Sequence, residues 1–144
     1  MALDPKLRTY DPKLVALSFK GAIVTGYTDG DFIAVTNDDG FESRTGADGS
    51  EDRVNKNITG VNVDVTLMGS SITNDVFNVF YEIDKATNLG YGAFSIKDLN
   101  GTMLLTSGEA YITKKADKSL GNGVGSVTWT FRCPQAIYNP GSNL

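Results

Sequence analysis

The residues with the clearest potential for chemistry lie in one polar segment, Asn37–Lys56. Its charged side chains are Asp38, Asp39, Glu42, Asp48, Glu51 and Asp52, with Arg44, Arg53 and Lys56. Clustered carboxylates can bind calcium, but this spacing does not follow the twelve-residue calcium loop, which also needs a glutamate at its last position. The segment is therefore interpreted as a solvated or intersubunit polar loop, with metal binding as the alternative.

The chain contains no histidine and a single cysteine, Cys133. The missing imidazole removes the commonest general base, the commonest zinc ligand and every triad or dyad built on them. Cys133 is interpreted as a small core residue, because it alternates with apolar residues on one strand. The glycine-rich stretch Gly121–Gly125 lacks the Lys-Ser/Thr pair of a phosphate-binding loop and precedes a strand, so it predicts a hairpin loop. We expect a non-enzymatic protein without cofactor or metal; a glycosidase-like carboxylate pair is a distant alternative.

Composition narrows the possible partners further. The formal net charge of −4 argues against a protein that grips nucleic-acid phosphates through clustered cations. No apolar run reaches the roughly 18–20 residues of a membrane span, and the N-terminus lacks the apolar core of a secretion signal. The length of 144 residues fits one domain with a substantial core.

Alternating apolar and polar residues predict a sheet with one buried and one solvated face. The clearest strands are Ile58–Met68 and Ser126–Cys133, and shorter ones are expected within 14–27, 32–36, 91–97, 103–107 and 109–115. The predicted core side chains of the two clear strands are Val61, Val63, Val65, Leu67, Trp129 and Phe131. Their opposite faces carry short polar residues, which line either a water-filled lumen or an ordinary solvated surface.

A change of period over Ser71–Ala86 predicts one amphipathic helix, with Phe77 and Phe80 packed on the sheet. Ser70 or Ser71 can cap its start, and Asn88 and Gly90 can end it. The predicted fold is mainly β: a β-sandwich or rolled β-barrel with one flanking α-helix and a long polar loop. The expected organisation is a single domain over 1–144, with an N-terminal arm (1–13), an extended inter-subunit loop (37–57) and a C-terminal tail (134–144).

The long polar loop needs an explanation, because compact domains seldom keep some twenty loop residues without a use. Such a segment cannot bury enough apolar surface to order itself. We therefore expect it to order against another copy of the chain. The expected contact residues are Asp38, Asp39, Phe41, Glu42, Arg44, Asp48, Glu51, Asp52 and Arg53.

The order of these features resembles the tail tube proteins of contractile-tailed bacteriophages, the myovirus tail tube family. The matching stretch runs from Tyr10 to Cys133, and its most telling pieces are R-T-G-A-D-G-S at 44–50, V-D-V-T-L-M-G-S-S-I-T-N-D at 63–75 and W-T-F at 129–131. None of these pieces is a catalytic motif. Their order and spacing carry the resemblance, which extends to bacteriocin and secretion-system tubes.

The resemblance implies a structural protein of the virion. Six copies would form a ring, and rings would stack into a hollow tube inside a contractile sheath. Sheets of the six copies would join around a lumen that passes DNA. On electrostatic grounds, the face that carries Asn62, Asp64 and Thr66 is our leading candidate for the lining of that lumen. The implied partners are other copies, the sheath protein outside, the tape-measure protein and then DNA in the lumen without specific binding, and baseplate and tail-terminator proteins at the ends.

Assembly would take place in the cytoplasm of the bacterial host. Two alternatives remain open at this point. One is the tube of a phage-like bacteriocin or injection system. The other, of a different class, is a monomeric β-sandwich module that binds a ligand or metal through the acidic segment.

Overall fold

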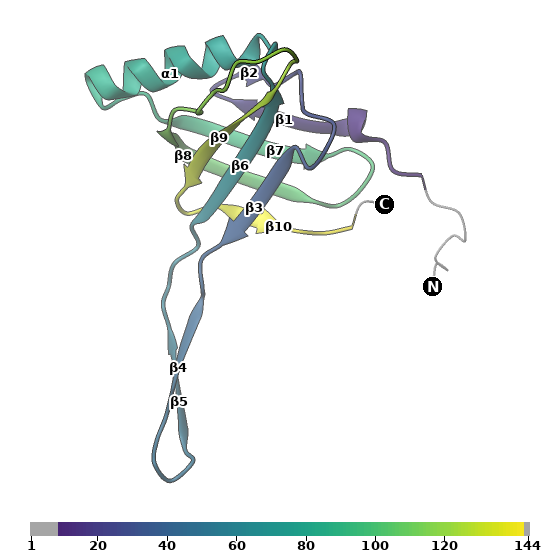
Figure 1. The fold of residues 1–144 in the computed structure, drawn as a ribbon. Coiled ribbons are helices and arrows are strands. Elements are labelled where there is room, and N and C mark those ends of the chain that lie inside the picture. The colour runs from purple at the N-terminus through teal and green to yellow at the C-terminus, as the bar shows by residue number, and fades with distance from the viewer. Residues whose placement is uncertain (1–8, 143–144) are drawn as a thin grey trace.

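The computed structural model describes residues 9–142, and these form a mainly β structure with one α-helix (Figure 1). The strands are β1 (Val15–Phe19), β2 (Ala22–Ile23), β3 (Ile33–Asn37), β4 (Phe41–Thr45), β5 (Glu51–Asn55), β6 (Val61–Met68), β7 (Gly92–Asp98), β8 (Leu104–Lys114), β9 (Ser126–Cys133) and β10 (Ile137–Asn139). The helix α1 spans Thr73–Thr87, and a 3-10 turn covers Pro12–Leu14. The predicted fold class is confirmed. Most of the predicted N-terminal arm, residues 1–8, lies outside the described residues.

The main sheet is continuous, and it bends at β8 into two layers. The strands follow the order β2-β1-β7-β8-β9-β6-β3, and all pairings are antiparallel. Along β8, Ser107 lies opposite Phe94 but Ala110 lies opposite Gly92, so β8 carries one extra residue between these pairs. Such a bulge bends its strand. The two strands predicted over 103–107 and 109–115 are therefore one bent strand, which pairs with β7 from Leu104 to Ala110 and with β9 from Tyr111 to Lys114.

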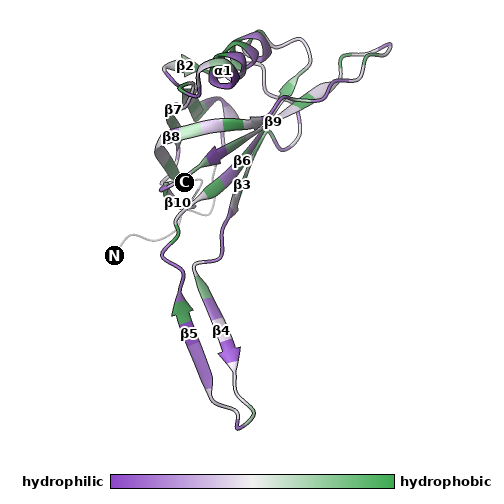
Figure 2. Ribbon diagram, turned by 90° about the vertical axis from the view of Figure 1, so that its left-hand side faces the viewer, coloured by the Kyte–Doolittle hydropathy of each residue, from purple (hydrophilic) through white to green (hydrophobic). Residues whose placement is uncertain are grey.

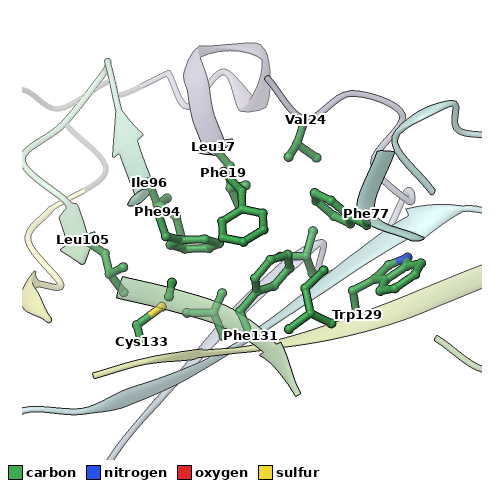
Figure 3. Close-up of a cluster of buried hydrophobic side chains, with 14 of the residues drawn as sticks. Leu17, Phe19, Val24, Phe77, Phe94, Ile96, Leu105, Trp129, Phe131 and Cys133 are labelled. Atoms are coloured by element: carbon green, nitrogen blue, oxygen red, sulfur yellow. The ribbon is translucent and has the colours of Figure 1, made fainter. Parts of the chain in front are cut away.

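The two layers enclose an aromatic core around Phe131 (Figure 3). The ring of Phe131 lies 5.1 Å from Phe19, 5.1 Å from Phe77 and 5.0 Å from Phe94, measured between centroids. Its neighbours thus come from β1, β7 and α1. The predicted core residues of β6 and β9 are buried: Val61, Val63, Val65, Leu67, Trp129 and Phe131.

Helix α1 packs on this core through part of its apolar surface. Phe77 is fully buried, whereas Phe80 is half-buried with its ring 5.4 Å from Phe19. The side chains of Ile72, Val79 and Ile83 are exposed. The apolar periodicity read from the sequence therefore covers two faces of the helix, of which one meets the sheet.

The helix start is fixed by hydrogen bonds to the body of the protein. Ser71 Oγ accepts the N–H of Thr73 at 3.2 Å and donates to the carbonyl of Thr25 at 2.6 Å, but neither Ser70 nor Ser71 is the N-cap that the sequence predicts. The N-cap position itself is Ile72, without a side-chain cap. At the other end, Asn88 adopts the left-handed conformation (φ 59°) that its predicted stop role requires.

The C-terminal segment is more ordered than its prediction as a tail. Ile137–Asn139 forms β10, which pairs with Leu104–Thr106 of β8. Because β9 pairs only with the later part of β8, the edge of the earlier part is free to accept β10. Ser107 Oγ also donates a hydrogen bond of 2.9 Å to the carbonyl of Pro134. The predicted tail is therefore corrected to an edge strand followed by a short end.

We predict that Phe77→Ala lowers the free energy of unfolding by about 3–5 kcal/mol, because the cavity it leaves is closed on all sides. Phe80→Ala should cost less, since this side chain is half-exposed. Val79→Ala is the matched control: its side chain is 53% exposed on the same helix. Urea denaturation followed by tryptophan fluorescence measures all three. Equal effects of Phe77→Ala and Val79→Ala would contradict the packing of α1 described above.

Candidate assembly surfaces

A two-stranded hairpin projects from the body of the protein (Figures 1 and 2). Strands β4 and β5 form their own sheet, separate from the main one. The segment Asn37–Lys56, predicted as an irregular loop, is thus a β-hairpin on two short linkers. Every residue of β4 and β5 is exposed. The prediction failed because a strand that is polar on both faces shows no alternation of hydrophobicity.

The turn of the hairpin is built from the G-A-D-G-S residues of the 44–50 motif. Gly46 N–H donates to the Ser50 carbonyl at 2.7 Å, and Gly49 has a φ of 88°, which favours glycine. Asp48 Oδ1 accepts hydrogen bonds from Ser50 N at 3.0 Å and Ser50 Oγ at 2.7 Å, which lower the pKa of Asp48. The motif therefore closes a tight hairpin, as Asp-Gly pairs commonly do.

The hairpin carries charge and exposed apolar surface together. The predicted contact residues lie on β4 (Phe41, Glu42, Arg44), in the turn (Asp48), on β5 (Glu51, Asp52, Arg53) and in the first linker (Asp38, Asp39). Phe41 is 54% exposed and Val54 57%. The guanidinium of Arg53 lies 4.6 Å from the centroid of the Phe41 ring, a cation–π distance. An isolated two-stranded hairpin is marginally stable in water, so this surface is suited to burial against a partner.

The structure argues against a shared metal site in this segment. Asp38 precedes β4 at the root of the hairpin, whereas Asp48 lies in the turn at its tip. Within residues 9–142, no group of three or more carboxylate, histidine or cysteine side chains is placed to hold a metal ion.

The part of the chain that the structure describes contains no helix that is long and apolar enough to cross a membrane.

Asp38 makes an ion pair with Arg132 of β9, which the sequence did not single out. Arg132 Nη2 lies 2.6 Å from Asp38 Oδ2, and Nη1 lies 3.2 Å from Asp38 Oδ1. The hydrogen bonds from Arg132 lower the pKa of Asp38 below its ordinary value of 3.8. The pair is therefore intact at neutral pH and is lost only as the pH falls through that lowered pKa. No local pattern links residues 94 positions apart, so sequence inspection had no signal for this contact.

The second candidate surface is the solvent-facing side of β6 and β9, which we call the polar sheet face. Its members are Asn62, Asp64, Thr66, Ser126, Thr128, Thr130 and Arg132. Strand register brings the two rows side by side, so that Asp64 pairs with Thr130 and Thr66 with Thr128. Thr130 Oγ1 donates to Asp64 Oδ1 at 2.9 Å, and the hydroxyls of Thr66 and Thr128 lie 3.0 Å apart. The face is an ordered ladder of short polar side chains.

The charge on the polar sheet face is nearly balanced. Asp64 is its one carboxylate, and the charge of Arg132 is neutralised by Asp38. At its margin, Lys114 of β8 lies opposite Thr130 and pairs with Asp117 at 2.9 Å. The face is therefore dominated by hydroxyls, and within residues 9–142 its single carboxylate, Asp64, makes no ion pair with a cation.

Comparisons with known proteins point to phage structures. No family model matches the chain. A structural protein, ORF10, of Pseudomonas phage KPP10 is 28% identical over 144 aligned residues, which cover 94% of this chain and 83% of that protein. The cryo-EM structure of the anti-feeding prophage cap, an AFP tube terminating cap, is similar in fold, with a TM-score of 0.57 and 12% identity. That match covers 97% of this chain and 95% of the cap. The chain is thus similar in sequence to a phage structural protein and in fold to a tube-terminating cap.

We predict that the hairpin contributes little to the stability of the body. Lys56 N–H donates to the Gly40 carbonyl at 3.0 Å, so a short Gly-Ser turn can replace residues 41–55 without moving the linkers. Because every replaced strand residue is exposed, the midpoint of thermal unfolding should stay within about 2 °C of the parent's. Circular dichroism measures this. A fall of 10 °C or more would mean that the hairpin is part of the folded core.

Proposed function

We propose that this protein is a non-enzymatic structural subunit of a phage tail tube. Six copies form a ring, and rings stack into a hollow tube that lies inside a contractile sheath and conducts DNA. The observation that carries the proposal is the projecting hairpin, whose ten strand residues are all exposed in the single chain. Sequence similarity to a phage structural protein supports the same assignment.

The hairpin is suited to contacts within and between rings. It extends away from the body, so it can reach a neighbouring copy without rearrangement of the core (Figure 2). Its mixed charges and the exposed Phe41 and Val54 offer a partner both ion pairs and apolar area. Interfaces that combine an aromatic anchor with a polar rim are typical of specific association.

An open sheet edge supports ring closure. Strand β3 stands at one end of the strand order and pairs with β6 alone within residues 9–142. An unpaired edge is a template for another chain, and a heterologous contact that closes on itself makes a ring without free edges. In the proposed ring, the sheets of neighbouring copies continue one another.

The polar sheet face is the proposed wall of the lumen. In a ring of six, Asp64 would supply six negative charges toward the bore, while the threonine hydroxyls are neutral. DNA carries about one negative charge per 1.7 Å of axis, so a wall with this composition repels it weakly and holds no phosphate. At about 0.15 M salt the field extends about 8 Å, which keeps DNA from the wall while leaving the channel open.

The remaining proposed partners are those that a phage tail tube subunit would meet. The sheath protein would cover the outside, where α1 exposes Ile72, Val79 and Ile83. The tape-measure protein and then DNA would occupy the lumen without specific binding. Baseplate and tail-terminator proteins would meet the two ends. The protein would thus be located in the virion tail after assembly in the host cytoplasm.

A second candidate function is that of a cap that ends a tube. Its support is the fold similarity to the anti-feeding prophage cap over nearly the whole of both chains. A repeating subunit must bind copies of itself at both ends of its ring, whereas a cap binds the tube at one end. The two functions are therefore separated by whether rings of the purified protein continue to stack.

We predict that the purified protein forms stacked rings at high concentration, because the hairpin and the β3 edge are both unpartnered in the single chain. Negative-stain electron microscopy measures this directly. The variant with a Gly-Ser turn in place of residues 41–55 should remain folded but stop at single rings or monomers. Single rings of the parent protein would favour the cap. Monomers at every concentration and salt level would contradict both candidate functions.

We predict that Asp64→Lys leaves tube assembly intact but slows or stops DNA ejection, because six lysines in the bore would bind phosphates. Glu109→Lys is the matched control, since it makes the same change of charge at an exposed position of β8, away from the proposed lumen residues and from α1. Ejection from virions that carry each variant can be followed by the fluorescence of a DNA-binding dye. Equal ejection rates in the two variants would contradict the placement of Asp64 in the lumen.

A further inference from the structure

The hairpin is attached to the body by two linkers that make few backbone hydrogen bonds. The first runs from Asp38 to Gly40 and the second from Lys56 to Gly60. Backbone hydrogen bonds join them at two points, Asp38 N–H to the Gly60 carbonyl at 3.3 Å and Lys56 N–H to the Gly40 carbonyl at 3.0 Å. Two of the linker residues are glycines. These contacts hold the linkers together, and a third, from Ala136 N–H to the Thr59 carbonyl at 3.2 Å, ties the second linker to the segment before β10. None of these three bonds connects a linker to β9 in the interior of the main sheet.

The side chain of Arg132 supplies that connection. It comes from β9, which pairs with both β6 and β8 in the interior of the main sheet. Its guanidinium binds both carboxylate oxygens of Asp38, and Nη1 also lies 3.2 Å from Asn62 Oδ1. A planar guanidinium with two parallel hydrogen bonds fixes the orientation of its carboxylate as well as its distance.

In the second linker, Gly60 has no side chain, and the guanidinium of Arg132 occupies the space where a Cβ atom would lie. A Cβ atom on Gly60 would lie 2.8 Å from Arg132 Cζ and 3.1 Å from Asp38 Oδ2, so a side chain at this position would displace the guanidinium. The ion pair therefore lies directly over Gly60. One side chain of the rigid sheet thus meets both linkers, Asp38 in the first and Gly60 in the second.

We propose that Arg132, together with Asp38 and Asn62, is a positioning residue that sets the direction in which the hairpin leaves the body. Its role in assembly rests on the proposed function, but its role in orientation does not. A five-residue strand and its turn place the tip about 20 Å from the root, so a rotation of about 20° at the root moves the tip by about 7 Å. Such a displacement is enough to separate the hairpin from a binding surface on a neighbouring copy.

The orientation can be measured on the single chain at low concentration by pulsed electron spin resonance. Ala47→Cys at the tip and Lys85→Cys on α1 provide exposed labelling sites, while the natural Cys133 is fully buried. The parent should show one narrow distance distribution. Arg132→Gln and Asp38→Asn should each widen it about twofold or more, and Arg132→Lys should give an intermediate width, since it keeps the charge but loses the two-point contact.

Two controls separate orientation from stability. Lys97→Gln removes a cation from an exposed position on β7 and should leave the distribution unchanged. The unfolding midpoint of each variant, measured by circular dichroism, shows whether the body remains folded at the temperature of the distance measurement, since both side chains of the ion pair are only 27% exposed. If Arg132→Gln fails to fold, Asp38→Asn tests the same contact from the linker. A distribution as narrow in Asp38→Asn as in the parent would overturn the proposal.

Assembly gives a second readout. If the parent forms tubes, Arg132→Gln and Asp38→Asn should each raise the concentration needed for tube growth by about tenfold, the size of effect common for coupled ion pairs. The exchanged pair Arg132→Asp with Asp38→Arg should recover part of the loss. Failure of the parent to form tubes would contradict the proposed function and leave the orientation measurement valid. Normal tube growth by a variant with a widened distribution would show that orientation is not needed for assembly, against this inference.

Discussion

Burial of Phe131 where both sheet layers and α1 meet is the interaction on which the rest of the structure depends. Its ring contacts Phe19 of β1, Phe94 of β7 and Phe77 of α1, all within 5.1 Å between centroids. Because the interior of a protein is closely packed, a ring that touches three elements fixes their relative positions. The bulge in β8 folds the sheet so that this contact can form, and α1 covers it from one side.

This core also explains why the hairpin can remain outside it. The body buries its apolar side chains without any contribution from β4 or β5, so their sequence is free to be polar on both faces. If the hairpin acts in assembly as proposed, stability and assembly depend on different parts of the chain. The two parts meet at the hairpin root, where Arg132 from the sheet interior holds Asp38 over Gly60.

Within β6 and β9, residues that pack in the core alternate with residues that form the polar sheet face. Each strand of the β6–β9 pair presents large apolar residues to the core and short polar residues to the other side. Hydrogen bonds such as Thr130 to Asp64 order the polar row without large side chains. A face that is rich in hydroxyls and low in net charge provides little for a polyanion to bind, which suits the proposed lumen.

The sequence by itself determined the fold class, the alternation of β6 and β9, the position of the helix and the absence of imidazole chemistry. These are local properties, since period and composition are read from neighbouring residues. Only the tertiary structure decided that Leu104–Lys114 is one bent strand, that Ile137–Asn139 pairs with β8, and that residues 41–55 form a hairpin. Each of these depends on partners distant in sequence or on strands that are polar on both faces. The pairing of Arg132 with Asp38 belongs to the same class, because an ion pair across the sheet is fixed by register and leaves no mark in the local pattern.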